Sequence, residues 1–108
     1  MTPEKQRIAI AEACGWTHIA FDRGWLKAGD GEIQGVIPNY LNDLNAIFYA
    51  EQWLWRKDWT LRAVFVDYLS TVNHVIGYKR QSGLDPLDAT AAQRAEAFLR
   101  TIGKWEED

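Results

Sequence analysis

The first part of the chain combines helix punctuation with helical spacing. The run Thr2-Pro3-Glu4 predicts a helix start, because a hydroxyl caps free amides, proline suits the first helical position and an acid favours the helix N-terminus. Small and apolar residues then recur at helical spacing as far as Cys14, and Gly15 predicts the stop. We therefore expect a helix over residues 3–14.

The next segment changes to a β pattern. Residues 16–21 are rich in β-branched and aromatic side chains and lie between glycine-containing turns, as strands commonly do. Two further runs, 25–27 and 32–37, flank the sequence Ala-Gly-Asp-Gly at 28–31. This arrangement predicts an antiparallel hairpin, with a longer loop as the alternative.

The middle of the chain predicts two amphipathic helices. Apolar side chains at helical spacing indicate a helix over about residues 43–54, with either Asn39 or Asn42 as its cap. Asp58 is the candidate cap of a second helix. Several of the apolar positions after it are β-branched, so a strand over 72–78 is the alternative at its end.

The last element carries the strongest local signal. After a polar loop over 78–87, Thr90 and Gln93 form a capping box, in which each side chain satisfies a free backbone amide of the helix start. The helix is expected to stop at Gly103, and Trp105 is expected to fold back on the core. The elements together predict a single α+β domain over residues 1–108, with three to four helices packed on a small antiparallel sheet in a layered, α/β/α-like arrangement.

Composition and charge narrow the class of protein. The chain has 108 residues, and 12 Lys+Arg against 15 Asp+Glu give 12 − 15 = −3, which provides no general attraction to nucleic acid or to an anionic membrane. No apolar run reaches the length of a membrane span, and residues 1–7 lack the apolar core of a signal peptide. The lone Cys14 cannot form an internal disulfide, so we expect a reducing, cytoplasmic compartment.

Three stretches carry a family resemblance: MTPEKQRIAIAEACGW at 1–16, PNYLNDLNA at 38–46 and ATAAQRAEAFLRTIGKW at 89–105. In this order they resemble small phage and prophage proteins grouped under the phage ABA-sandwich domain. The resemblance implies a phage-derived origin and a layered α/β fold, and it brings no catalytic residues. Residues 47–55 depart from it, because they are heavily aromatic where the family usually has a polar helix.

The sequence gives little support for a metal-binding site or for nucleophilic catalysis. The two histidines, His18 and His74, do not stand at ligand spacing, and we expect His18 to be a half-buried sheet residue. Asp67, Ser70 and His74 form a serine–histidine–acid stripe on the second predicted helix. Nothing nearby predicts an oxyanion hole, so we expect neither a catalytic site nor a metal.

Acid–base and phosphate chemistry are also weakly represented. The carboxylates Asp43, Glu51 and Asp67 lie on predicted helices, where caps and solvated faces are their usual roles. The glycines match neither the P-loop pattern G-x-x-x-x-G-K-[ST] nor the dinucleotide-binding pattern G-x-G-x-x-G, so turns explain them better. We therefore expect no cofactor and no enzymatic activity.

The densest functional signal is an aromatic-basic cluster. If residues 53–59 are helical, Trp55 and Trp59 share a face at i, i+4 spacing, and indoles beside cations can stack on a ligand or anchor an interface. Packing in the core, or self-association, is the alternative. A second group of basic and aromatic residues, at 78–80, follows in the predicted loop over 78–87. The candidate binding residues are Trp55, Arg56, Lys57, Trp59, Tyr78, Lys79 and Arg80.

Two functional hypotheses follow. The leading one is a phage- or prophage-encoded, non-enzymatic protein that binds a host protein, such as a defence component, inside the bacterial host. The alternative is an oligomeric binder that sequesters a small nucleotide signal between subunits. A domain without a ligand site is a further alternative. Neither membrane nor nucleic acid is an expected partner, whereas a homo-oligomer is compatible with either hypothesis.

Overall fold

Helix α1 (Pro3–Ala13) opens the fold as its sequence predicts. The computed structural model describes residues 1–28, 31–75 and 89–107. The Thr2 hydroxyl accepts a hydrogen bond from the Lys5 amide at 3.2 Å, with proline at the start of the helix. Gly15 follows with φ +97°, a left-handed conformation that turns the chain out of the helix at little cost for glycine.

Three antiparallel strands follow in the order β1 (Trp16–Ala20), β2 (Arg23–Ala28) and β3 (Gly31–Val36). Strands β2 and β3 pair in regular register, which confirms the predicted hairpin strands; residues 29–30 between them lie outside the described part. Strand β1 is irregular, because its register shifts between Thr17 and Ala20 and His18 has φ 51°. His18 is exposed, so the expectation of a half-buried residue was wrong.

Helix α2 (Leu44–Lys57) starts one residue later than expected and with another cap. The Asp43 carboxylate accepts from the Asn45 amide at 2.9 Å, so neither Asn39 nor Asn42 is the N-cap. The two asparagines belong instead to the preceding turn, in which the amides of Asn42 and Asp43 donate to the Asn39 carbonyl. The helix continues to Lys57, where Asp58 is its C-cap.

Helices α3 (Leu61–Val75) and α4 (Ala91–Thr101) complete the described elements. Residues 72–75 belong to α3, so the alternative strand does not form there; the remainder of that segment lies outside the described residues. The predicted capping box of α4 is confirmed, with the Thr90 amide donating to Gln93 Oε1 at 2.8 Å and the Gln93 amide to Thr90 Oγ1 at 3.1 Å. Trp105 folds back on the core and lies 5.0 Å from the Arg100 guanidinium.

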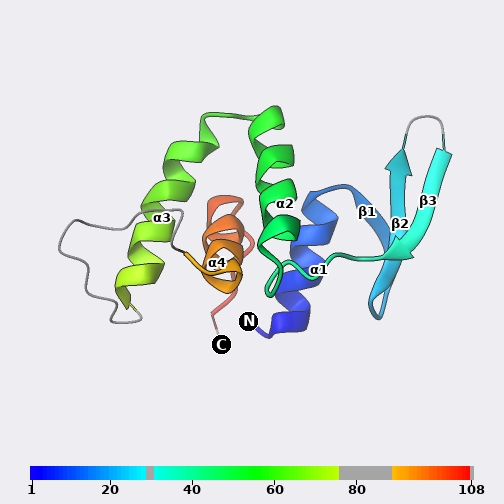
Figure 1. The fold of residues 1–108 in the computed structure, drawn as a ribbon, viewed down its shortest axis with the longest axis horizontal. Helices are drawn as coiled ribbons and strands as arrows, with labels where there is room; N and C mark the ends of the chain where they lie inside the picture. Colours follow the sequence, from blue (N-terminus) through cyan, green and yellow to red (C-terminus); the bar gives the residue numbers. More distant parts are fainter. Residues whose placement is uncertain (29–30, 76–88, 108) are drawn as a thin grey trace.

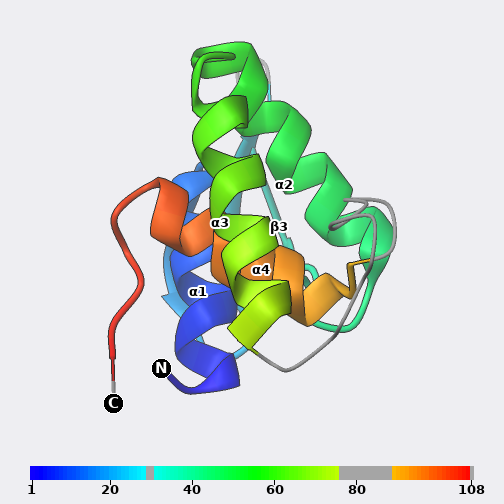
Figure 2. The ribbon, with the colours of Figure 1, turned by 90° about the vertical axis from the view of Figure 1, so that its left-hand side faces the viewer.

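Figure 1 shows the helices gathered at one end of the long axis and the sheet at the other, and Figure 2 looks along that axis from the helix end. Helix α4 packs against the other three helices, and the sheet meets the helices mainly where β1 contacts α1. The largest fully buried side chains include Ile10, Ile47 and Phe98. The predicted α+β class, with helices and a small antiparallel sheet, is confirmed. Every helix that the structure describes is too short or too polar to cross a membrane.

A buried ion pair joins α2 to α4. Glu51 and Arg94 are 4% and 7% exposed, and the guanidinium donates to both carboxylate oxygens, at 2.7 and 2.5 Å. The guanidinium also lies over Phe48 and Phe65, 4.7 and 5.5 Å from the ring centres. Burial raises the pKa of the Glu51 carboxyl, and the Arg94 charge opposes this shift. The pair fixes the position of α2 relative to the rest of the helices.

Candidate functional site

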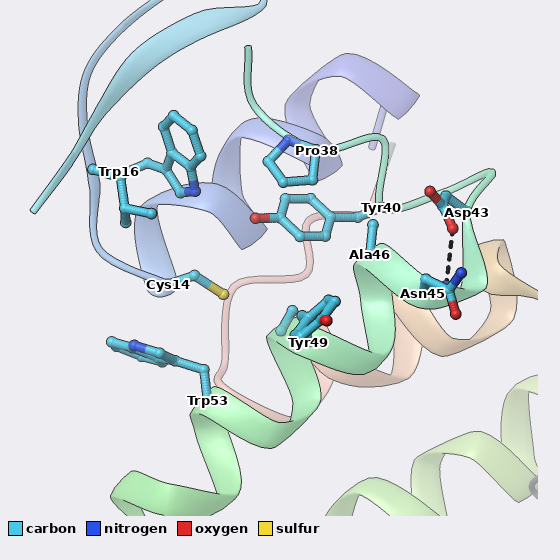
Figure 3. A pocket seen from close by; sticks show the side chains of 11 residues that line it. Cys14, Trp16, Pro38, Tyr40, Asp43, Asn45, Ala46, Tyr49 and Trp53 are labelled. Atoms are coloured by element: carbon cyan, nitrogen blue, oxygen red, sulfur yellow. Dashed lines mark hydrogen bonds between the residues drawn. The ribbon is translucent and has the colours of Figure 1, made fainter. Parts of the chain in front are cut away.

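An open cleft of about 390 Å³ lies between the sheet and helix α2. Four aromatic side chains line it, and Figure 3 shows them converging on it from α2, from the start of β1 and from the loop after β3. We call it the aromatic cleft, after Trp16, Tyr40, Tyr49 and Trp53. Its volume is in the range of sites that hold a small ligand or an inserted side chain.

The Trp16 indole forms the sheet wall of the cleft. The ring lies over Gly24 of β2 and Gly35 of β3. A Cβ atom at Gly24 would lie 3.3 Å from Trp16 Cε3, and one at Gly35 would lie 3.9 Å from Trp16 Cη2. Leu26 pairs with Trp16 across the strands and lines the same face. The two glycines thus leave the space in which a flat aromatic surface covers the sheet.

The helix wall is a stripe of α2 at i, i+4 spacing. Tyr49 and Trp53 line the cleft, and Lys57 follows one turn later with its Nζ 4.2 Å from the Trp53 ring centre. Tyr49 is 76% exposed, so most of its ring is available to another molecule. A cation against an indole face is held by the quadrupole of the ring.

The side chains of Cys14 and Tyr40 form the floor of the cleft, close to the Trp16 indole (Figure 3). Cys14 and Tyr40 are 8% and 3% exposed. Burial raises the pKa of the Cys14 thiol to about 11, and the neighbouring Tyr40 hydroxyl offsets part of the shift. Burial also raises the pKa of Tyr40. Both groups are therefore neutral at physiological pH.

The chemistry of the cleft favours binding over catalysis. A protonated thiol is a poor nucleophile, so Cys14 lacks the activation that a catalytic cysteine needs. Asp43 lies at the helix start, where its carboxylate caps α2, and Asn45 is beside it (Figure 3). Among the residues that the structure describes, no group of three or more His, Cys, Asp and Glu could hold a metal ion.

The structure separates the residues of the aromatic-basic cluster. Trp55 is half-buried, and its ring packs edge-on against Phe65 at 5.2 Å, whereas Trp59 is 75% exposed. They do not share a helical face, because α2 ends at Lys57 and Trp59 lies beyond it. Arg56 is exposed on the last turn of α2. The predicted loop residues Tyr78, Lys79 and Arg80 lie outside the described part of the chain.

The other candidate residues have structural positions. Asp43 caps α2 and Glu51 pairs with Arg94, which accounts for two of the three carboxylates considered for acid–base chemistry. Asp67 is exposed on α3. Ser70 and His74 lie on the same helix, but their side chains are outside the described part.

Reasoning from the sequence missed Cys14, Trp16, Tyr40, Tyr49 and Trp53 as cleft residues. One signal was present, because Tyr49 and Trp53 are an aromatic i, i+4 pair that lies wholly within α2. Trp55 and Trp59 have the same spacing, and the position of the helix end decides between the two pairs. Among the predicted residues that the structure describes, Lys57 is the one that lies against a cleft aromatic.

Comparison of the chain with protein-family models, with curated proteins and with solved structures finds no match in any of the three. The resemblance to phage ABA-sandwich proteins therefore stays a prediction. No family assignment bears on the site, and the interpretation of the aromatic cleft depends on its own geometry.

Proposed function

We propose that the protein is a non-enzymatic accessory protein of a phage or prophage that binds a host protein in the bacterial cytoplasm. In this proposal the aromatic cleft holds an apolar or aromatic side chain of the partner. The single observation that supports it is the exposure of Tyr49, at 76%, on the wall of a cleft built from three further aromatic residues. Aromatic side chains around a pocket are typical of the centres of protein interfaces.

The charge of the cleft bears on the nucleotide alternative. The described residues that line it include the acid Asp43 and neither lysine nor arginine. A phosphate in the cleft would lack a cation in contact with it, apart from Lys57 at the rim. An uncharged side chain suits these walls better, so the observations favour a protein partner over a nucleotide.

The experiment is a selection from a displayed peptide library, followed by affinity measurements with two matched variants. Tyr49 and Trp59 are 76% and 75% exposed, but only Tyr49 lines the cleft. We expect the selected peptides to carry an aromatic or aliphatic anchor and to bind Tyr49→Ala about tenfold or more weakly. Binding to Trp59→Ala should stay within about twofold of wild type.

The host part of the proposal is tested with the same pair of variants. A host protein recovered from bacterial lysate by wild type and by Trp59→Ala, but not by Tyr49→Ala, is the expected result. Recovery that depends on Trp59 and not on Tyr49 would contradict the assignment of the cleft. A nucleotide panel that binds with Tyr49-dependent affinity would favour the alternative function.

A further inference from the structure

The outer edge of β3 presents main-chain groups whose direction follows from the strand register. The Ile37 amide donates to the Asp22 carbonyl at 2.8 Å, so Ile37 stands at a hydrogen-bonded position at the end of the β2–β3 ladder. Hydrogen-bonded pairs alternate with non-bonded ones in antiparallel ladders. The amides and carbonyls that point away from β2 are therefore those of Glu32, Gln34 and Val36.

This edge lacks most of the features that usually block strand addition, and Glu32 is the one charged residue in the strand. The other edge of the sheet is β1, which is irregular at His18 and contacts α1. In contrast, β3 is regular over its six residues and contains neither proline nor lysine. Ile33 and Val36 on it are 59% and 54% exposed. Exposed apolar side chains on a regular open edge favour pairing with another strand.

We propose that β3 pairs antiparallel with β3 of a second copy of this chain, about a two-fold axis beside Gln34. In this register the outward groups of Glu32, Gln34 and Val36 bond to those of the partner's Val36, Gln34 and Glu32. The two sheets join into one continuous sheet, with about six new main-chain hydrogen bonds.

Apolar complementarity selects this register. The Ile33 side chain stands opposite the partner's Gly35, which provides space on the face that carries the Trp16 indole. Ile33 thus covers the indole edge of the other copy on each side of the axis. A pairing centred on Ile33 would instead set Gly31 against Gly35, and no side chain would cover that edge.

Charge complementarity supports the same register. Glu32 stands opposite the partner's Val36, and the partner's Arg23 is the next residue across the sheet on the same face. Glutamate and arginine are long enough to meet over the valine. At the axis two neutral Gln34 side chains face each other, so no like charges are opposed.

A two-fold axis perpendicular to the sheet places both aromatic clefts on the same face of the dimer. One partner with two anchors, or two identical partners, would then be held with higher avidity. The pairing itself does not depend on what the cleft binds, so the two proposals succeed or fail separately.

Sedimentation velocity across a wide range of concentration tests the pairing. Wild type should show a monomer–dimer equilibrium, and Gln34→Glu and Gln34→Lys should each weaken dimerisation about fivefold, because like charges then face each other. An equimolar mixture of the two variants should restore the dimer as a heterodimer. Gln52→Glu and Gln52→Lys, exposed on α2, should leave dimerisation unchanged and serve as matched controls.

A wild type that stays monomeric throughout would overturn the proposal. So would a dimer that is indifferent to both Gln34 charges. A Gln34→Lys variant that dimerises more strongly would show pairing opposite Glu32 and overturn the register. As a second variant, Gln34→Pro removes the outward amide but no bond to β2, so it should weaken the dimer about tenfold while the monomer keeps its circular dichroism spectrum.

Discussion

Replacing Arg94 with methionine is expected to destabilise the fold by about 3–5 kcal/mol, because it leaves a buried carboxylate without its partner. The Glu51 and Arg94 side chains are only 5% and 9% exposed, so water cannot replace the lost bonds. Methionine fills much of the same space against Phe48 and Phe65, so the loss reports mainly on charge and hydrogen bonding.

The magnitude is large against the stability that a domain of this size usually has. A chain of 108 residues is expected to have an unfolding free energy of about 5–15 kcal/mol, so the variant should lose a large part of it. The corresponding fall in Tm is roughly 10–30 °C. The loss should be smaller at acid pH. Without Arg94, burial keeps the pKa of Glu51 above its unfolded value, and protonation removes the buried charge.

Urea unfolding followed by circular dichroism measures these differences for the single variants and for the double variant Glu51→Leu, Arg94→Met. The double variant should lie within about 1 kcal/mol of wild type, because two apolar side chains need no counter-charge. A single variant that costs less than about 1 kcal/mol would refute the reasoning, as would a double variant whose loss equals the sum of the single losses.

Three further predictions concern local features of the fold. Gly15→Ala should cost about 1–2 kcal/mol, measured by urea unfolding, because φ +97° is strained for a residue with a Cβ atom; Gly31→Ala, in open space, is the control. The unfolding free energy should fall by about 2–3 kcal/mol as the pH rises from about 9 to 11, because the Cys14 thiol ionises at lower pH in the unfolded chain than in the folded one. Cys14→Ala should flatten that part of the pH profile. Thr90→Ala should lower the unfolding free energy by about 1 kcal/mol, whereas Thr90→Ser should not.

The N-terminal starts of α1 and α4 were predictable because the sequence signals for them are local. Thr2 and Pro3 start α1, and Thr90 with Gln93 starts α4, through contacts between residues at most three apart. The N-cap of α2 was not predictable in this way, because Asn39, Asn42 and Asp43 all precede the helix. Which of these residues caps the helix depends on a turn in which the chain folds back on the Asn39 carbonyl. Asparagine and aspartate have similar capping propensities, so propensity does not distinguish between them.

The aromatic cleft was beyond prediction from the sequence for a different reason. It places Trp16, at the start of β1, and Trp53, on α2, around one cleft, and no local pattern relates the two. Periodicity identified α2 but not which of its aromatic pairs faces the sheet. That depends on Asp58 ending the helix and on Glu51 being held against α4, which turns Tyr49 and Trp53 to the opposite side.

The central claim is that the aromatic cleft is the binding surface, and the indole N–H signals in a two-dimensional ¹H–¹⁵N NMR spectrum test it most directly. On titration with a selected peptide, the signals of Trp16 and Trp53 should shift in proportion to occupancy, while that of Trp59 stays in place. A shift of the Trp59 signal with unchanged Trp16 and Trp53 would contradict the account.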